Sequence, residues 1–595
     1  MLERTTALVV EPNTRDSLAS LPGRNAASEP QRAAFTRKNG GGWSDVTAAA
    51  FNDDVRALAK GLIQADLAVG DRVAIMSKTR YEWTVADFAA WAAGLVPVPI
   101  YETSSTEQIE WILRDANVSA IIVESPTHAQ MVNGVREATP TLRHVWEIDA
   151  GHLDGVSRDG AAISDAQLQE RIEASTRDSL ATIIYTSGTT GRPKGCELTH
   201  GNFLTLAEES IATMPEILLP RDAATLLFLP LAHVFARFIE VLAVSSRTRM
   251  GHSSDIANIL TDFGAFKPTY ILAVPRIFEK IYNKAEATAM AEGKGKIFTV
   301  AAATSIAYSE ALDSGKVPFS LTAKHAVFDK LVYGKLRDLL GGRVRYVVSG
   351  GAPLGTRLGH FFRGIGVTVL EGYGLTETSA PATVNVPSKV KIGTVGPPLP
   401  GVGIRIADDG EILIRGINVF RGYHNNPEAT AAAIVDGWFH TGDLGELDPD
   451  GFLKITGRKK EVLVTAGGKN VAPAVLEDRL RGHPLVSQCV VVGDQKPFIG
   501  ALLTLDEEML PGWAANHGLG TLSAEQARTN ATVLAELQIA VDQANLAVSK
   551  AESIRKFAVL AGDFTEENGY LTPSLKLKRN IVMRDFEDEV AKLYS

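Results

Sequence analysis

The chain has 595 residues, enough for about three to six folding units and a large buried core. Its composition, 45% apolar and 22% charged, is close to the globular average and excludes a disordered, collagen-like or coiled-coil protein. The formal net charge of −9 argues against a general nucleic-acid binder, which would be basic. Cys196 and Cys489 are too few for a disulfide framework or a four-cysteine zinc site, and they favour a reducing, cytoplasmic compartment.

No targeting or membrane-spanning segment is predicted. Residues 1–13 carry Glu3, Arg4 and Glu11 and have no apolar stretch of signal-peptide length. The longest apolar run, residues 88–100, is broken by two prolines and is shorter than the ~20 residues that span a bilayer. We therefore expect a soluble protein, and peripheral contact with a membrane stays open.

The first 185 residues predict a layered α/β fold. Residues 20–42, rich in Gly, Asn and Arg, are expected to form an irregular start. Residues 72–76 and 120–123 are expected to be buried parallel strands, and residues 51–65 predict a helix beside them. Such alternation of strands and helices is typical of sheets covered by helices.

The middle of the chain predicts a helical region followed by a β-rich one. Residues 277–340 have strong helical patterns, and the Gly-Gly pair that follows is a helix stop. Residues 344–348 predict a strand that enters the turn 349–353. Residues 393–456 contain many short β-runs separated by Gly, Pro, Asn and Asp, which is typical of a compact β-rich subdomain. Near the end of the helical region 277–340, an apolar stripe is expected on one helix face. It consists of Phe328, Leu331, Val332, Leu336, Leu339 and Leu340.

We predict a large N-terminal domain over residues 1–456 and a small α+β domain over residues 457–595. The small domain contains expected strands at 490–492 and 501–503. The predicted fold class is α/β, with layered sheets and a β-rich subdomain in the large domain. The final helix is expected to bury one face made of Val582, Phe586, Val590 and Leu593.

The strongest chemical signal is a loop of small residues that follows a predicted buried strand, 181–185. Glycines let backbone N–H groups approach an anion, hydroxyls add donors and a lysine adds positive charge, so the loop predicts a phosphate cradle. It is not a Walker A loop, because Gly195 stands where Ser or Thr would follow the lysine. A surface turn is the alternative interpretation. The loop contains Thr186, Ser187, Gly188, Thr189, Thr190, Gly191 and Lys194.

Two further motifs could complete a nucleotide site. Residues 371–378 include the carboxylate of Glu377, which would repel a nucleotide unless a divalent cation such as Mg²⁺ lay between them. A charge at a helix N-terminus is the alternative for Glu377. The turn 349–353 leaves room for a base and a substrate carboxyl group, although its sequence also suits an ordinary turn. Its small residues are Gly350, Gly351 and Ala352.

Two more motifs lie near the predicted domain boundary. Asp443 can accept hydrogen bonds from both hydroxyls of a ribose, and a turn-capping role is its alternative. Arg458 and Lys460 belong to a charge run that composition alone would place on a solvated face. A turn with Gly467 and Gly468 follows.

The five motifs, in this order, resemble those of the AMP-forming acyl-CoA synthetases of the adenylate-forming superfamily. The resemblance covers roughly residues 30–595. It implies that Tyr373 packs on adenine and that Thr376 contacts phosphate. It also implies that Glu377 helps to hold Mg²⁺, in a network that includes Thr189. Other nucleotide-binding positions implied in the second motif are Glu371, Gly372 and Gly374.

The resemblance gives roles to residues near the boundary as well. Arg458 would contact ribose or phosphate, and Lys460 would be the hinge about which a mobile lid domain turns. The loop of Gly467 and Gly468 would approach the pantetheine arm of coenzyme A.

The family places its adenylation lysine near the end of the chain. Alignment on the Lys-x-x-Arg ending of residues 569–579 selects Lys576, with Lys578 as the rival, and the two are expected to point to opposite sides of an extended loop. This segment and the Leu-Pro-Leu-Ala-His-Val-Phe run around His233 are similar to the long-chain branch. His233 would border the acyl carboxyl group or be a capped core histidine.

We therefore predict a ligase that joins a fatty acid, long in chain by this resemblance, to coenzyme A. It would use ATP, form acyl-AMP and release pyrophosphate and AMP. No nucleic-acid partner is expected, and the protein would be a monomer or a homodimer. Two alternatives stay open: an acyl-AMP ligase that loads a carrier protein, and a catalytically silent nucleotide-binding regulator.

Overall fold

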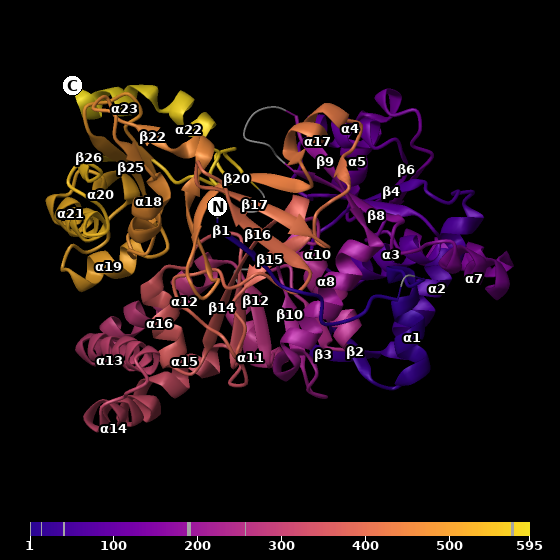
Figure 1. Cartoon of the computed structure of the whole chain (residues 1–595), viewed down its shortest axis with the longest axis horizontal. Helices are drawn as coiled ribbons and strands as arrows, with labels where there is room; N and C mark the ends of the chain where they lie inside the picture. Colours follow the sequence, from indigo (N-terminus) through magenta and orange to yellow (C-terminus); the bar gives the residue numbers. More distant parts are fainter. Residues whose placement is uncertain (1, 14, 40–41, 187–191, 256–257, 573–575) are drawn as a thin grey trace.

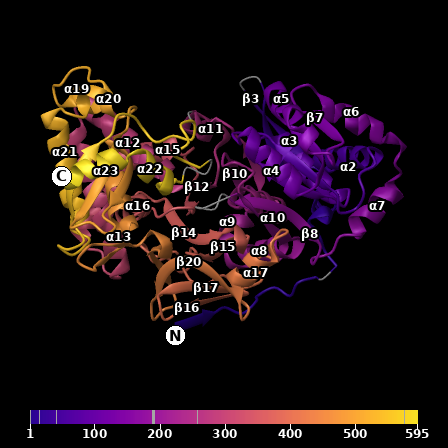
Figure 2. The same cartoon turned by 90° about the horizontal axis from the view of Figure 1, so that it is seen from above.

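The computed structural model describes residues 2–13, 15–39, 42–186, 192–255, 258–572 and 576–595. It has the predicted fold class, with a large α/β domain that contains a β-rich sheet and a smaller C-terminal domain (Figure 1). Seen from above, the smaller domain and the N-terminal lobe lie on opposite sides of the molecule, with the β-rich sheet between them (Figure 2).

The N-terminal lobe contains a parallel sheet in the order β5-β4-β6-β7. All of β6 and nearly all of β4 are buried, which explains their continuous apolar runs. The two strands expected here are confirmed. The strands are β4 (Arg72–Met76), β5 (Val96–Ile100), β6 (Val118–Val123) and β7 (His144–Glu147). The helices of this lobe are α2 (Ala48–Gln64), α3 (Tyr81–Ala92), α4 (Thr106–Asp115), α5 (Pro126–Gly134), α6 (His152–Asp159) and α7 (Asp165–Glu173).

Three more sheets complete the α/β part. Their orders are β10-β11-β2-β3, β12-β13-β14-β15 and β18-β9-β8. Since β13 and β14 are parallel and Ser349 lies opposite Glu371, the turn 349–353 and the motif 371–378 begin at the same edge of one sheet. The strands are β2 (Ala33–Asn39), β3 (Gly42–Thr47), β8 (Leu180–Thr186), β9 (Lys194–Thr199), β10 (Ala224–Leu227), β11 (Arg249–His252), β12 (Tyr270–Ala273), β13 (Tyr346–Ser349), β14 (Thr368–Leu375), β15 (Ala380–Val384) and β18 (Gly422–Tyr423).

The helices that pack with these sheets include the predicted helical region. It forms four α-helices and one π-helical turn, Asp329–Tyr333. The α-helices with these sheets are α1 (Leu21–Ser28), α8 (His200–Thr213), α9 (Pro215–Leu218), α10 (Val234–Ser246), α11 (Ile259–Phe266), α12 (Pro275–Ala291), α13 (Gly295–Asp313), α14 (Phe319–Phe328), α15 (Gly334–Leu339) and α16 (Thr356–Gly364).

The β-rich sheet is antiparallel and runs in the order β1-β16-β17-β20-β19, with β21 beside β20. The predicted domain boundary after residue 456 would fall inside β21, which continues on this sheet to Arg458. The boundary therefore stays a prediction. The elements are β1 (Leu2–Thr5), β16 (Val402–Ile406), β17 (Glu411–Gly416), α17 (Pro427–Ala433), β19 (Ile434–Val435), β20 (Trp438–Leu447) and β21 (Leu453–Arg458).

The smaller domain is built on the sheet β24-β25-β26. Successive residues of β24 pack into two separate apolar clusters, one on each face of the sheet. Cys489 and Val491 belong to one cluster, and Val490 and Val492 belong to the other, as expected for a sheet covered on both faces. The elements are β22 (Leu463–Val464), β23 (Asn470–Val471), α18 (Pro473–Arg481), β24 (Val486–Val492), β25 (Ile499–Leu505), α19 (Leu510–Asn516), α20 (Ala524–Ala527), α21 (Ala531–Asn545), β26 (Ile554–Val559), α22 (Arg579–Asp585) and α23 (Glu587–Tyr594).

Two local expectations were wrong. Residues 20–42 are not irregular, because they form α1 and the strand β2, which pairs with β11 and β3. The final helix is two helices that meet at Phe586. In the apolar stripe of residues 328–340, Leu336 and Leu340 are buried, whereas Leu331 in the π-helical turn lies on the surface.

A buried ion pair joins α10 to the N-terminal lobe. Arg237 on α10 and Asp87 on α3 are both fully buried and pair with each other. The rings of Trp83 and Trp91 each lie 5.4 Å from the guanidinium carbon. Burial, and then the neighbouring Asp87, raises the pKa of Glu240 one turn along α10, so Arg237 balances the charge of Asp87.

We predict that Arg237→Leu lowers the free energy of unfolding by about 3–5 kcal/mol, because it leaves a buried carboxylate without its cation. Arg114→Leu is the matched control, since Arg114 pairs with Glu110 at 3.1 Å on the surface. That variant should lose less than about 1 kcal/mol. Urea unfolding of both variants measures the difference, and equal losses would contradict the role given to the buried pair.

Candidate active site

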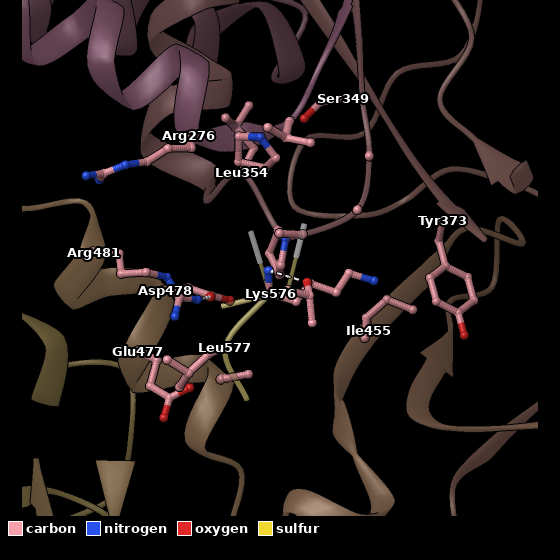
Figure 3. Close-up of a pocket in the computed structure, with 18 of the residues that line it drawn as sticks. Arg276, Ser349, Leu354, Tyr373, Ile455, Glu477, Asp478, Arg481, Lys576 and Leu577 are labelled. Carbon is pink, nitrogen blue, oxygen red and sulfur yellow. Dashed lines mark hydrogen bonds and ion pairs between the residues drawn. The ribbon is translucent and has the colours of Figure 1, made fainter. Parts of the chain in front are cut away.

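A cavity of about 3260 Å³ lies between the large and the small domain. The lining takes residues from both domains, and Figure 3 shows Lys576 between Ser349 and Leu354 on one side and Asp478 and Arg481 on the other. The predicted site residues that line it are Thr186, His233, Gly350, Gly351, Ala352, Glu371, Gly372, Tyr373, Gly374, Thr376, Glu377, Asp443, Arg458, Lys460 and Lys576.

The remaining predicted residues fall into two groups. Lys194, Gly467 and Gly468 do not belong to the lining of this cavity. Ser187, Gly188, Thr189, Thr190 and Gly191 lie outside the described residues, so the loop expected to hold phosphate is described only at its two ends.

Both oxygens of the Asp443 carboxylate have hydrogen-bond partners in the cavity. Asp443 is 4% exposed, and the Tyr373 hydroxyl donates to its Oδ2 at 2.6 Å. Arg458 Nε donates to its Oδ1 at 2.8 Å, across the β20–β21 pair in which the two residues are partners. Burial and the Asp443 charge raise the pKa of Tyr373, which therefore stays protonated and keeps donating. Both carboxylate oxygens are thus held in fixed directions.

Glu377 is oriented by a tyrosine that sequence analysis missed. The Tyr423 hydroxyl donates to Glu377 Oε1 at 2.9 Å. Lys194 Nζ lies 5.0 Å from the centre of the Tyr423 ring, so Tyr423 lies between the end of the phosphate-loop strand and Glu377. Tyr423 is a single tyrosine in a short strand, and its local sequence carries no signal of this role.

Two glycines of the cavity lining stand where another residue would be strained. Gly351 has φ +84, a left-handed conformation that disfavours other residues. A Cβ at Gly374 would lie 1.7 Å from the carbonyl oxygen of Ala380, at the bulge in the β14–β15 pair, so glycine is required for the two strands to pair there.

Lys576 is presented by a hairpin of the small domain. The Lys576 amide donates to Thr572 Oγ1 at 3.0 Å, and its carbonyl accepts from the Thr572 amide at 2.8 Å. The Lys578 amide donates to the Tyr570 carbonyl at 2.8 Å. Loss of hydration, followed by the charge of Arg458, lowers the pKa of Lys576, while Asp443 and Glu377 act in the opposite direction. Its ammonium therefore lies in the electrostatic range of both site carboxylates.

The expectation that Lys576 and Lys578 face opposite sides was wrong. Lys576, Leu577 and Lys578 all line the cavity, and Leu577 also packs against the apolar cluster of the small domain. Residues on either side of an inward-facing residue share the other face of an extended segment. The two lysines differ in position along the hairpin, because Lys578 already caps α22.

Arg579 fixes the base of this hairpin. It pairs with Glu477 on α18, and its Nη1 donates to the Val491 carbonyl at 2.7 Å. Glu477 Oε1 also accepts from the Val491 amide at 2.7 Å. This gives a physical reason for the Lys-x-x-Arg spacing, since the arginine anchors the segment that projects Lys576.

Ion pairs connect the two domains at one side of the cavity. Arg276 on α12 contacts Asp506 at 2.9 Å, and Lys280 contacts Glu508 at 3.1 Å. Asp506 is 10% exposed and Arg276 22% exposed in their side chains, whereas Glu508 is well exposed, so the first pair is the better shielded. Asp506 Oδ1 also accepts from the Met509 amide at 3.1 Å at the start of α19. Sequence analysis did not find these residues, which lie 230 positions apart.

Two carboxyl groups with raised pKa values face the same interface. Burial, with a contribution from Asp478, raises the pKa of Glu371 to about 7. Burial also raises the pKa of Asp478 on α18 to about 6. Glu371 Oε2 accepts from the Leu354 amide at 3.1 Å, which holds it beside the turn 349–353.

His233 is a capping histidine that also lines the cavity. Its Nδ1 accepts from the Phe235 amide at 3.2 Å at the start of α10. Burial, with the charge of Lys576 adding to it, lowers the pKa of His233 to about 3. The ring is therefore neutral near pH 7, and its proton is on Nε2, since Nδ1 accepts a hydrogen bond.

The fold and the site can now be compared with known proteins. Residues 23–424 match the AMP-binding enzyme family, and residues 460–595 match the C-terminal domain of AMP-binding enzymes. The chain belongs to this family. It is 51% identical over 584 residues to the long-chain-fatty-acid–CoA ligase FadD15 of Mycobacterium tuberculosis, covering 98% of this chain and 97% of that protein.

Solved structures of this fold include other ligases. The anthranilate CoA ligase AuaEII, in complex with anthranoyl-AMP, matches with a TM-score of 0.74 and 19% identity over 98% of this chain and 99% of that one. The O-succinylbenzoate coenzyme A synthetase of Bacillus subtilis, in complex with ATP and magnesium ion, matches with a TM-score of 0.67 and 23% identity, over 94% and 98%. These likenesses show the fold.

Among the described residues, no helix is both long enough and apolar enough to cross a bilayer. This agrees with the short apolar runs of the sequence.

We predict that Glu371→Gln removes a pH-dependent loss of stability. Because the folded pKa of about 7 lies above the usual 4.5, the unfolded chain releases this proton first, and wild-type stability falls as pH rises from about 4.5 to 7. The variant should gain about 3 kcal/mol relative to wild type over that range. Unfolding at pH 5 and pH 7.5, with the exposed Glu428→Gln as control, tests this. A constant difference between Glu371→Gln and wild type would contradict it.

Proposed function

We propose that this protein activates a long-chain fatty acid in two steps. The carboxylate of the acid attacks the α-phosphate of ATP, so that acyl-AMP forms and pyrophosphate leaves. The thiol of coenzyme A then attacks the acyl carbonyl, so that the thioester forms and AMP leaves. The observation that carries the proposal is the meeting of Lys576 from the small domain with Asp443 and Glu377 from the large domain in one cavity. The 51% identity to a named long-chain-fatty-acid–CoA ligase supports the choice of substrates.

In this proposal the large domain binds the nucleotide. Asp443 accepts the ribose hydroxyls, for which its two oxygens are already directed, and Arg458 contacts ribose or phosphate. Tyr373 packs on adenine beside the turn of Gly350, Gly351 and Ala352. Thr376, Thr186 and the loop of residues 187–191 with Lys194 bind phosphate.

The donor set also fits Mg²⁺. No group of three or more His, Cys, Asp or Glu side chains suited to a metal was found in the described part of the chain. Mg²⁺ bound with a nucleotide needs only one or two carboxylates, since phosphate oxygens and water complete its coordination. Glu377 supplies one carboxylate, and Tyr423 orients it. With Thr189, it would hold Mg²⁺, which would neutralise phosphate charge.

Lys576 supplies positive charge where negative charge builds up in the first step. It would contact the substrate carboxylate and the α-phosphate as a cation positioned by the hairpin. His233 would donate from Nε2 toward the acyl carboxyl end. We assign the arrangement in this structure to the first half-reaction, because Lys576 lies in the cavity.

The second half-reaction needs a different domain arrangement. The small domain would turn about Lys460, withdraw Lys576 and bring the turn of Gly467 and Gly468 toward coenzyme A. These glycines lie outside the cavity lining here, as that assignment requires. One mobile domain could then serve two chemical steps in one site.

The protein would act in the cytoplasm as a monomer or a homodimer, with peripheral contact to a membrane that supplies its lipophilic substrate. Release of AMP from ATP and palmitate tests the function directly. Under multiple-turnover conditions, the proposal expects AMP and palmitoyl-CoA to form only when coenzyme A is present. AMP formation that depended on a carrier protein would instead support the carrier-loading alternative, and no AMP at all would support a silent regulator.

We predict that Lys576→Ala lowers the rate of acyl-AMP formation about a hundredfold or more, since it removes a charge from the reacting phosphate. Lys578→Ala, two residues away on the same face of the hairpin, is the matched control and should change the rate little. Pyrophosphate exchange into ATP measures the first step, and synthetic acyl-AMP with coenzyme A measures the second. If Lys578→Ala proved the more damaging variant, the assignment of the adenylation lysine would be wrong.

A further inference from the structure

Exposed apolar side chains gather on one helical projection of the molecule. Among the described residues, nearly half of the large apolar side chains on the surface lie between residues 290 and 339. This segment contains α13, α14 and the π-helical turn, and α14 lies at the outer end of the large domain in Figure 1. Single exposed apolar residues are ordinary, whereas a concentration of them marks an interaction surface.

The most exposed of these residues form a stripe. Phe319 is 87% exposed, Val327 56% and Leu331 57%. With Ala323 between the first two, they follow one another at four-residue steps, which places Phe319, Ala323 and Val327 on one side of α14, and Leu331 follows in the π-helical turn. None of the ten residues of α14 is buried. We call Phe319, Ala323, Val327 and Leu331 the α14 stripe.

The other side of α14 contacts the large domain through His325. The His325 ring stacks on Tyr308 of α13 with 3.9 Å between ring centres, and its Nε2 lies 2.6 Å from the Gly364 carbonyl oxygen. The π-helical turn lets Tyr333 turn inward and donate to the Ala301 carbonyl at 2.7 Å, while Leu331 stays outside. The helix is therefore fixed, with the α14 stripe facing away from the protein.

The segment that carries the α14 stripe is rich in lysine. Residues 314–335 contain four lysines and one acidic residue, Asp329, which is paired with Arg337, in a chain whose net charge is −9. Within the described structure, Lys316, Lys324 and Lys330 make no ion pair. Lysines beside exposed apolar side chains favour contact with acidic membranes, because the charges are attracted to anionic lipid and the apolar groups can be buried there.

We propose that the α14 stripe and its lysines dock this protein on the surface of a bilayer that contains acidic phospholipids. The apolar side chains would enter the boundary between headgroups and acyl chains, and each lysine would contribute about 1 kcal/mol of attraction to the anionic surface. The choice of a membrane rests on the proposed function, because a long-chain fatty acid partitions into bilayers. A second copy of the chain is the competing occupant, but the lysines on both copies would repel each other.

Sedimentation with vesicles tests the docking. Equal parts of phosphatidylcholine and phosphatidylglycerol should carry down the full-length protein, and pure phosphatidylcholine should bind at least about tenfold less. Phe319→Ser/Val327→Ser/Leu331→Ser should lower the affinity for the acidic vesicles at least about tenfold. The triple control Val69→Ser/Leu219→Ser/Leu546→Ser removes similarly exposed side chains elsewhere and should bind like wild type.

Charge reversal gives an independent test. Lys324→Glu/Lys330→Glu should lower binding to the acidic vesicles by more than about tenfold, with melting temperature unchanged because neither lysine makes an ion pair in the described structure. Absence of wild-type binding to acidic vesicles, or equal binding by the stripe and control triples, would overturn the proposal. So would a dimer in solution that the stripe variant converts to a monomer.

The binding assay needs no catalysis, so it separates this proposal from the enzymatic one. AMP release from a short, water-soluble fatty acid without vesicles should be the same for the stripe variant and wild type. Vesicle binding without any AMP release would reject the proposed function and leave the docking intact. AMP release without vesicle binding would reject the docking and leave the proposed function intact.

Discussion

The contact between two separately folded domains is the constraint on which the site depends. The small domain has its own apolar clusters, so its position relative to the large domain is set by surface contacts and by the connecting segment. The shielded ion pair of Arg276 with Asp506 is one such contact. Lys576 can reach Asp443 and Glu377 electrostatically only while the domains are arranged in this way. Interdomain contacts of this kind are strong enough to select an arrangement and weak enough to break.

Inside the cavity, the charged groups are already oriented by neutral or oppositely charged partners. Asp443 is held by Tyr373 and Arg458, and Glu377 by Tyr423. Groups held in fixed directions before a polar ligand enters are a source of electrostatic stabilisation in enzymes. In our proposal these hydrogen bonds are exchanged for bonds to ribose and for a bound cation.

The sequence was informative where one segment carries the signal. The phosphate loop, the motif 371–378 and Asp443 each have a distinctive local pattern, and Thr186, Glu377 and Asp443 from these three segments all line the cavity. Tyr423 and the Arg276–Asp506 pair had no such pattern, because their roles come from contacts between distant segments. The π-helical turn could not be predicted from the sequence either, since analysis of helical periodicity assumes 3.6 residues per turn throughout. The two lysines were expected on opposite faces, whereas side chains two residues apart in an extended segment point to the same face.

The central claim is that this domain arrangement serves the first chemical step, and the Arg276–Asp506 pair gives the most direct measurement. Arg276→Ala, Asp506→Asn and the double variant should be assayed for acyl-AMP formation and, separately, for thioester formation from synthetic acyl-AMP. Asn keeps the acceptor that caps α19 while removing the charge. We predict that each single variant slows acyl-AMP formation about tenfold, that the double variant is no slower, and that thioester formation is unchanged. Equal slowing of both steps, or additive losses in the double variant, would contradict the account.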